Sequence, residues 1–117
     1  MPTIRDVVQA LSRRTGVKAA IVLGRDGLTI DSATQDGLDS DSVAAVVPPV
    51  VATCTGLGSA AACGGFESGV VEFDGGIALV AAVTPDTLLA LVVGPHTNVG
   101  SLLYEIRRHR SAIAKLL

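Results

Sequence analysis

The pattern in this sequence that most resembles a chemically functional motif is the glycine-rich stretch Gly56-Leu57-Gly58-Ser59-Ala60-Ala61. It follows the apolar run Val50-Val51-Ala52-Thr53, and a strand followed by a GxGxxA turn is the outline of a dinucleotide-binding fingerprint. However, Gly64-Gly65 would end the following helix after little more than one turn, which is too short for a βαβ crossover. We therefore favour a packing role, in which small residues let another element approach closely, and keep a small nucleotide- or metabolite-binding domain as an alternative.

Other reactive side chains are few and isolated. Cys54, Cys63, His96 and His109 do not have the spacing of metal-ligand pairs, and two cysteines are too few for a disulfide framework. Ser59 lies outside a GxSxG context, and the chain has no Walker A motif, so we do not expect it to bind or hydrolyse GTP itself. The sequence predicts no catalytic residue, no cofactor and no metal, and we expect that the protein is not an enzyme.

Charge is sparse and slightly acidic, except for one basic cluster near the C-terminus. The formal net charge of −2 argues against a nucleic-acid binder. Arg107, Arg108 and Arg110 most simply form a solvated helix end, but they are also candidate docking residues for an acidic partner surface.

Aromatic residues make up only 3% of the chain, so the core must consist of Val, Ala, Leu and Ile. We expect a second subunit to cover part of this apolar surface.

Apolar periodicity and turn residues predict one domain over residues 1–117, of α+β class. Thr3 with Asp6 forms a capping-box pattern that begins a helix ending at Gly16. Two strands follow over 17–23, buried on both faces, and 28–33, half exposed. After a second helix, three strands over 66–73, 77–83 and 87–93 form an antiparallel meander. Thr97 or Asn98 begins a last helix, whose buried face includes apolar residues as far as Leu117.

The second helix, over about 41–63, is predicted with a conflict between pattern and propensity. Its apolar residues keep helical spacing, but valine is a poor helix former and an interior proline costs about 3 kcal/mol, so we expect a break or irregularity near Pro48-Pro49. Residues 43–66 carry no charge and are long enough to span a bilayer. Prolines, glycines and the absence of flanking basic clusters favour a buried or interfacial helix instead, so we expect no membrane insertion.

The predicted order of elements, αββαβββα, resembles the Roadblock/LC7 family over essentially the whole chain. The resemblance rests on the hairpin formed by residues 16–23 and Arg25-Asp26-Gly27-Leu28, the long small-residue helix, Val70-Val71-Glu72-Phe73 and residues 89–93. The stretch Thr97-Asn98-Val99-Gly100, running into Leu103-Tyr104-Glu105-Ile106, looks like bacterial members of the MglB-like kind. The resemblance implies a profilin-like fold with a five-stranded antiparallel sheet flanked by helices.

The resemblance also implies a function in protein contacts. Such domains are similar in forming dimers, in which the second helices pack antiparallel and the third strands pair into one continuous sheet. The resemblance further implies that the helical face of such a dimer can dock a Ras-like small GTPase of the MglA type. We therefore expect a cytoplasmic, bacterial, homodimeric regulator or scaffold of such a GTPase. The alternative is a structural dimerisation adaptor of the dynein-light-chain Roadblock type, with no effect on nucleotide turnover.

An uncharged helix of small residues is hard to leave in water, so isologous pairing of this helix is expected on physical grounds as well. We expect Val51→Asp or Gly58→Glu to break the dimer. The predicted dimer interface consists of residues from the second helix and the third strand: Val43, Val47, Val50, Val51, Cys54, Leu57, Gly58, Ala61, Val70 and Val71.

Overall fold

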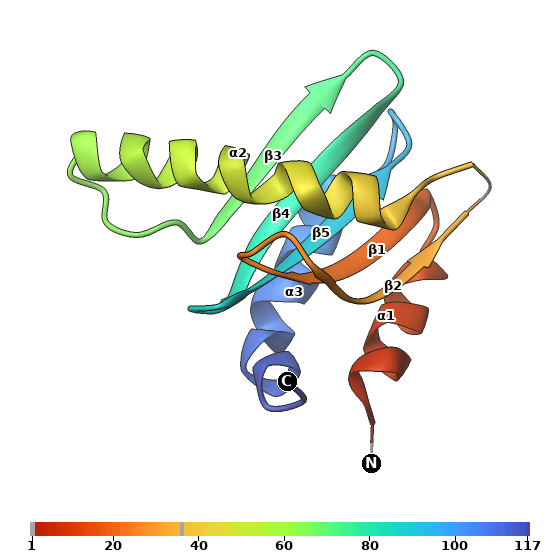
Figure 1. Ribbon diagram of the computed structural model, residues 1–117. Coiled ribbons are helices and arrows are strands. Elements are labelled where there is room, and N and C mark those ends of the chain that lie inside the picture. The colour runs from red at the N-terminus through yellow and green to blue at the C-terminus, as the bar shows by residue number, and fades with distance from the viewer. Residues whose placement is uncertain (1, 36) are drawn as a thin grey trace.

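The predicted order of three helices and five strands is confirmed. The computed structural model describes residues 2–35 and 37–117 (Figure 1). The elements are α1 (Ile4–Ser12), β1 (Val17–Gly24), β2 (Thr29–Thr34), α2 (Ser40–Ala60), β3 (Ser68–Phe73), β4 (Gly76–Thr84), β5 (Thr87–Val93) and α3 (Val99–Ala114). All strand pairs are antiparallel, and the sheet order is β2-β1-β5-β4-β3. β1 and β5 therefore form the centre of the sheet, and β2 and β3 form its two edges.

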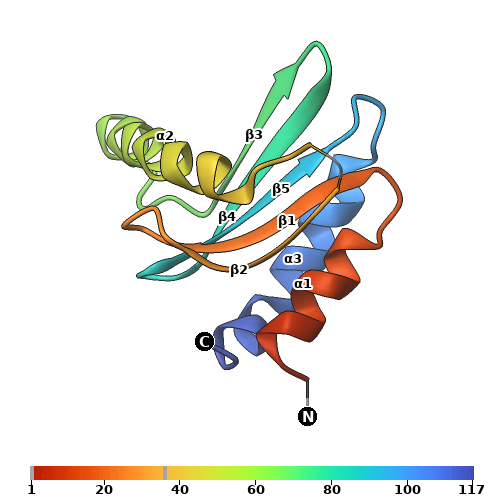
Figure 2. The same ribbon diagram turned by 45° about the vertical axis from the view of Figure 1, so that its right-hand side comes forward.

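Helices cover both faces of the sheet, but unequally. Helices α1 and α3 lie side by side on one face, and α2 crosses the other face alone (Figure 2). Beneath α1 and α3, the larger core contains leucine, isoleucine and valine side chains such as Leu79, Leu91 and Ile106. Beneath α2, the core is smaller and includes three alanines among its eight buried residues: Ala19, Ile21, Leu23, Ala44, Val47, Val51, Leu88 and Ala90. The face under α2 is therefore held by a thinner set of contacts.

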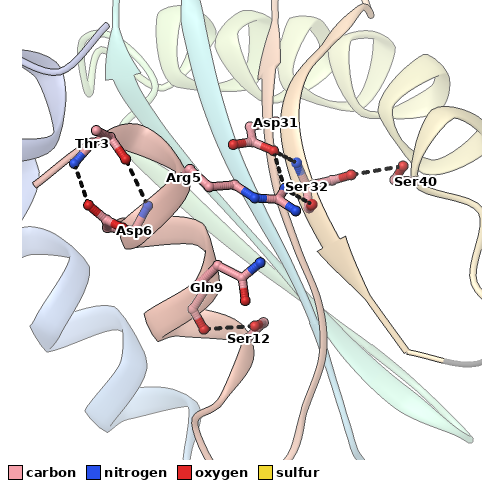
Figure 3. Close-up of polar contacts among 8 residues, drawn as sticks. All are labelled: Thr3, Arg5, Asp6, Gln9, Ser12, Asp31, Ser32 and Ser40. Atoms are coloured by element: carbon pink, nitrogen blue, oxygen red, sulfur yellow. Dashed lines mark hydrogen bonds and ion pairs between the residues drawn. The ribbon is translucent and has the colours of Figure 1, made fainter.

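Each helix begins at a polar cap. In α1 the predicted capping box is confirmed: the Asp6 amide donates to Thr3 Oγ1 at 3.2 Å, and the Thr3 amide donates to Asp6 Oδ2 at 2.8 Å (Figure 3). Helix α2 begins after Asp39, where the Ser42 hydroxyl and the Asp41 amide donate to the carboxylate and lower its pKa. These hydrogen bonds stabilise the folded state at pH values above the ordinary pKa of aspartate, and the stabilisation is lost as the pH falls through the lowered pKa of Asp39. Asn98 caps α3.

Helix α2 runs without interruption from Ser40 to Ala60, so the predicted break at Pro48-Pro49 is wrong. Proline cannot donate to the carbonyl four residues earlier, which leaves the helical bonds to Ala44 O and Ala45 O unformed. Val47 and Val51, on either side of the prolines, are both buried against the sheet, and this packing outweighs the local cost of the prolines.

The ends of two helices differ from expectation. Helix α2 ends at Ala60, three residues earlier than expected, because Ala62 adopts a positive φ. Leu117 lies beyond the end of α3 and is exposed, contrary to expectation.

The turn between β1 and β2 lies against the same part of α2. Gly27 has a φ of +87°, and a Cβ built there would lie 3.6 Å from Ala45 Cα and 3.7 Å from Ala44 O. The glycine therefore permits a left-handed turn that sits beside the two carbonyls affected by the prolines.

We predict that Gly27→Ala lowers the free energy of unfolding by about 1–2 kcal/mol, the cost of the left-handed conformation for an L-residue. Urea denaturation followed by circular dichroism measures this loss. Gly65→Ala is the matched control, because Gly65 has open space around it and no positive φ. A change of less than about 0.5 kcal/mol is expected there, as for most surface substitutions. Equal stabilities of the two variants would contradict the prediction.

Candidate interaction surface

Helix α2 divides into a half that packs on the sheet and a half that does not. Its buried residues are Ala44, Val47 and Val51, all in the first twelve positions. Residues 52–60 contain no buried side chain, and this half projects beyond the strands (Figure 1). Leu57, in the free half, is 69% exposed. By length and composition alone, α2 is also a helix that could cross a membrane. However, the first half of α2 packs on the sheet of its own domain. Any partner that covers the exposed free half must therefore lie next to the domain.

An apolar groove runs between the first half of α2 and the strands β3 and β4. Its volume is about 520 Å³, and valine side chains from both sides dominate its lining. Val46 and Val50 line it from α2, and Val71 and Phe73 line it from β3. These four side chains are exposed, and Phe73 is 63% exposed. We call the set of Val46, Val50, Leu57, Val71 and Phe73 the α2–β3 face. Complete burial of a fully exposed side chain of this kind contributes about 1.5–3 kcal/mol, and these partly exposed side chains would gain a corresponding part of it.

The two edges of the sheet differ in how their backbone is protected. On the β2 edge, Arg5 reaches over from α1, where its Nη1 donates to Asp31 Oδ1 at 2.7 Å and to Ser32 O at 3.1 Å (Figure 3). A charged side chain on an edge strand hinders pairing with another chain. On the β3 edge, Val70, Val71 and Phe73 are exposed, and Glu72 is the only charged residue of the strand. The β3 edge is therefore the more suitable one for strand pairing.

The structure divides the predicted interface residues into exposed and buried groups. Val50, Leu57, Val70 and Val71 are exposed, as is Ala61, while Val43, Cys54 and Gly58 are partly buried. By contrast, Val47 and Val51 are buried in the core beneath α2, and Val51 is only 2% exposed. These two valines contact the sheet of their own chain, and little of either side chain is accessible to a second subunit. Their assignment to a subunit contact stays a prediction.

Two exposed residues of this surface were missing from the predicted set, although the sequence carried a signal for each. Val46 precedes Val50 by four residues and so shares its side of α2. Phe73 follows Val71 by two residues and so lies on the same face of β3. Both residues line the groove.

The glycine-rich stretch lies inside and at the end of α2. Gly56 to Ala60 are helical and Ala61 is the cap, so the strand–turn–helix context of a dinucleotide site is absent from this segment, which the structure describes fully. A Cβ at Gly58 would lie 2.7 Å from Gly64 O. Gly58 therefore allows the chain to fold back tightly after the helix, which agrees with the packing role favoured above.

The basic residues of α3 face different neighbours. Arg110 Nη2 donates to Glu67 O at 3.4 Å, and Arg107 Nη2 donates to Ser68 Oγ at 3.5 Å. These two arginines thus contact Glu67 and Ser68, where β3 begins. Arg108 is exposed, and among the described residues no ion pair involves it. The docking role of all three residues stays a prediction, and Arg108 is the one with no side-chain hydrogen bond or ion pair among the described residues.

In the part of the chain that the structure describes, this surface is not accompanied by a cluster of metal-binding side chains. Residues 2–35 and 37–117 contain no group of three or more His, Cys, Asp or Glu side chains that could hold a metal ion. Cys54 and Cys63 are free thiols. What the surface offers is exposed aliphatic and aromatic area beside an open strand edge, and this combination can bind another protein.

Fold and surface together define a small α+β domain with one thinly covered, apolar sheet face. The chain belongs to the Roadblock/LC7 domain family, whose model matches residues 3–93. Myxococcus xanthus MglB has a similar structure, with a TM-score of 0.86 at 21% identity, over 97% of this chain and 93% of that one. A Roadblock/LC7 domain from Streptomyces avermitilis gives a TM-score of 0.84 at 22% identity, over 96% and 95% of the two chains.

A third similar structure is the gliding protein MglB from Thermus thermophilus. Its TM-score is 0.83 at 20% identity, over 97% of this chain and 87% of that chain. A search of curated proteins finds no significant match. At these identities the structural likeness establishes the fold, including the predicted five-stranded antiparallel sheet flanked by helices.

Proposed function

We propose that this chain forms a homodimer through the α2–β3 face, and that the dimer regulates or scaffolds a Ras-like small GTPase of the MglA type. One observation carries the dimer: the first half of α2 and the edge strand β3 expose apolar side chains on the two sides of one groove, and exposed Leu57 lies two turns further along α2 on the side of Val50. An isologous contact would bury both copies of this surface together. A similar structure, described as MglB with a tetrameric arrangement, supports self-association as a property of this fold.

The GTPase part of the proposal is supported by the similarity to MglB proteins over nearly the whole chain. In this proposal the domain acts in the cytoplasm and supplies a docking surface rather than a reactive group. The GTPase keeps its own nucleotide-binding site, and the dimer stabilises one nucleotide state by binding it more tightly than the other.

Nucleotide-dependent capture tests this proposal. The purified, tagged protein serves as bait in lysate of its own source cells, once with a non-hydrolysable GTP analogue and once with GDP. We expect a small GTPase to be retained at least about tenfold more strongly in the GTP condition, which corresponds to about 1.4 kcal/mol of preference.

Phosphate release from the purified GTPase, measured with and without the dimer, then separates regulation from scaffolding. An increased or decreased rate indicates a regulator. A GTPase that binds while its rate is unchanged indicates a scaffold. Equal retention in both nucleotide states, or retention of a protein that is not a GTPase, would contradict the proposal and favour the structural adaptor.

A further inference from the structure

Charge is divided between the two terminal segments, which contain α1 and α3, and the rest of the chain. By sequence, residues 1–16 and 95–117, which contain α1 and α3, carry seven Lys and Arg and two Asp and Glu, a net of +5. The remaining residues carry two basic and nine acidic side chains, a net of −7. The overall charge of −2 therefore combines two basic terminal segments with an acidic remainder. The helices of the basic segments, α1 and α3, lie on the face of the sheet opposite α2 (Figure 2). Such a division favours acidic partners on the side of α1 and α3.

A groove lies between these two helices. Both α1 and α3 pack on the sheet, but they make little direct contact with each other. The space between them has a volume of about 420 Å³. Val7 and Leu11 line it from α1, and Ile106 and Ile113 line it from α3. Its sides also carry small exposed residues, Ala10 on α1 and Ala112 on α3, which leave it open to solvent.

The surroundings of the groove carry unpaired positive charge. At one end, Arg14, which follows the C-cap of α1, forms an ion pair with Glu105 of α3, so both of these charges are already compensated. Arg108 of α3 lies four residues before Ala112, and Lys115, the C-cap of α3, lies three residues after it, so both are neighbours of Ala112 at helical spacing. Both are exposed, and no ion pair involves them among the residues that the structure describes.

We propose that this groove binds an amphipathic helix of a partner protein, whose apolar stripe is flanked by carboxylates. The aliphatic lining selects the apolar stripe, and Arg108 and Lys115 select acidic flanks. A second copy of this chain has no such helix to offer, because α1, α2 and α3 carry one carboxylate each, namely Asp6, Asp41 and Glu105. An anionic membrane fits less well, because the groove is concave with alanines on its sides, whereas membrane surfaces bind protruding apolar side chains.

A display library of amphipathic helices tests this inference on the full chain. Each peptide has about 18 residues, or five helical turns, with Leu and Ala on one stripe. The flanking positions carry Glu, Lys or Gln at equal frequency. We expect the peptides selected by the wild-type protein to have net negative flanks, and their affinity to fall as salt is raised.

The decisive variant is Ala112→Glu, which places a carboxylate in the groove and four residues from Arg108. We expect it to weaken binding of the selected peptides by at least about tenfold. Ser111→Glu is the matched control: it adds the same charge at an exposed position outside the groove, four residues from Arg107, and should weaken binding by no more than about threefold. Both substitutions can form helix-stabilising pairs with these arginines, so both variants should keep the wild-type thermal midpoint.

Several results would overturn the inference. Selection of basic or neutral flanks, no selection at all, or equal binding to wild type and Ala112→Glu would each do so. A lower assembly mass for Ala112→Glu in light scattering would assign the groove to a second copy. Sedimentation with phosphatidylserine vesicles that Ala112→Glu abolishes would assign it to a membrane. The outcome does not depend on the α2–β3 face, so it can fail or succeed separately from the proposed function.

Discussion

Val50→Asp should convert the proposed homodimer into a folded monomer, raising the dissociation constant at least about 100-fold. Truncation of a hot-spot residue at the centre of an interface costs about 2 kcal/mol or more, and an unpaired carboxylate adds its own desolvation. Every 1.4 kcal/mol is a tenfold change in the dissociation constant. In an isologous dimer the substitution also enters the interface twice. Because Val50 is 48% exposed in the single chain, the monomer should keep its stability. Light scattering over a concentration series measures the dissociation constant, and circular dichroism verifies the fold.

The matched control for this experiment is Ile30→Asp. Ile30 is 50% exposed and β-branched like Val50, but it lies in β2, at the opposite edge of the sheet. This variant should have the same mass as the wild type. A dimer that survives Val50→Asp, or that Ile30→Asp dissociates, would show that the interface lies elsewhere. A wild-type chain that remains monomeric at high concentration would refute the homodimer itself.

Much of the fold could be predicted because its local signals are strong. The pair Thr3 and Asp6 predicted the start of α1, and the apolar run between two turns predicted β5 at its observed bounds. The sheet order was not predictable by such reasoning, because the central pairing of β1 with β5 joins segments about seventy residues apart. Sequence patterns report local conformation, whereas this pairing follows from packing of the whole chain.

The orientation of α2 was the harder problem for the candidate site. Apolar residues occur on almost every side of this helix, so periodicity could not distinguish the side that contacts the sheet from the side left free. Val50 and Val51 therefore looked equivalent in the sequence. In the structure Val50 belongs to the α2–β3 face, and Val51 belongs to the core. The same core contacts explain why α2 stays continuous through two prolines.

Neighbouring positions on α2 should consequently respond to the same substitution in opposite ways. Val51→Asp places a carboxylate in the core beneath α2, where Val51 is only 2% exposed and its neighbours are apolar. An uncompensated buried charge costs about 3–5 kcal/mol, a large part of the stability of a domain of this size. We therefore expect Val51→Asp to lower the urea midpoint strongly or to unfold the chain, rather than to give a folded monomer as the sequence suggested.

Val51→Ala separates burial from charge at the same position. It removes two carbon atoms from the core and should cost about 2 kcal/mol, while leaving the α2–β3 face intact. This variant should still dimerise, and its unfolding midpoint should rise with protein concentration, as expected when dimerisation stabilises the fold. A folded, monomeric Val51→Asp with wild-type stability would show instead that Val51 belongs to the subunit contact. The comparison of Val50→Asp with Val51→Asp thus tests which side of α2 faces the sheet and which side faces the partner.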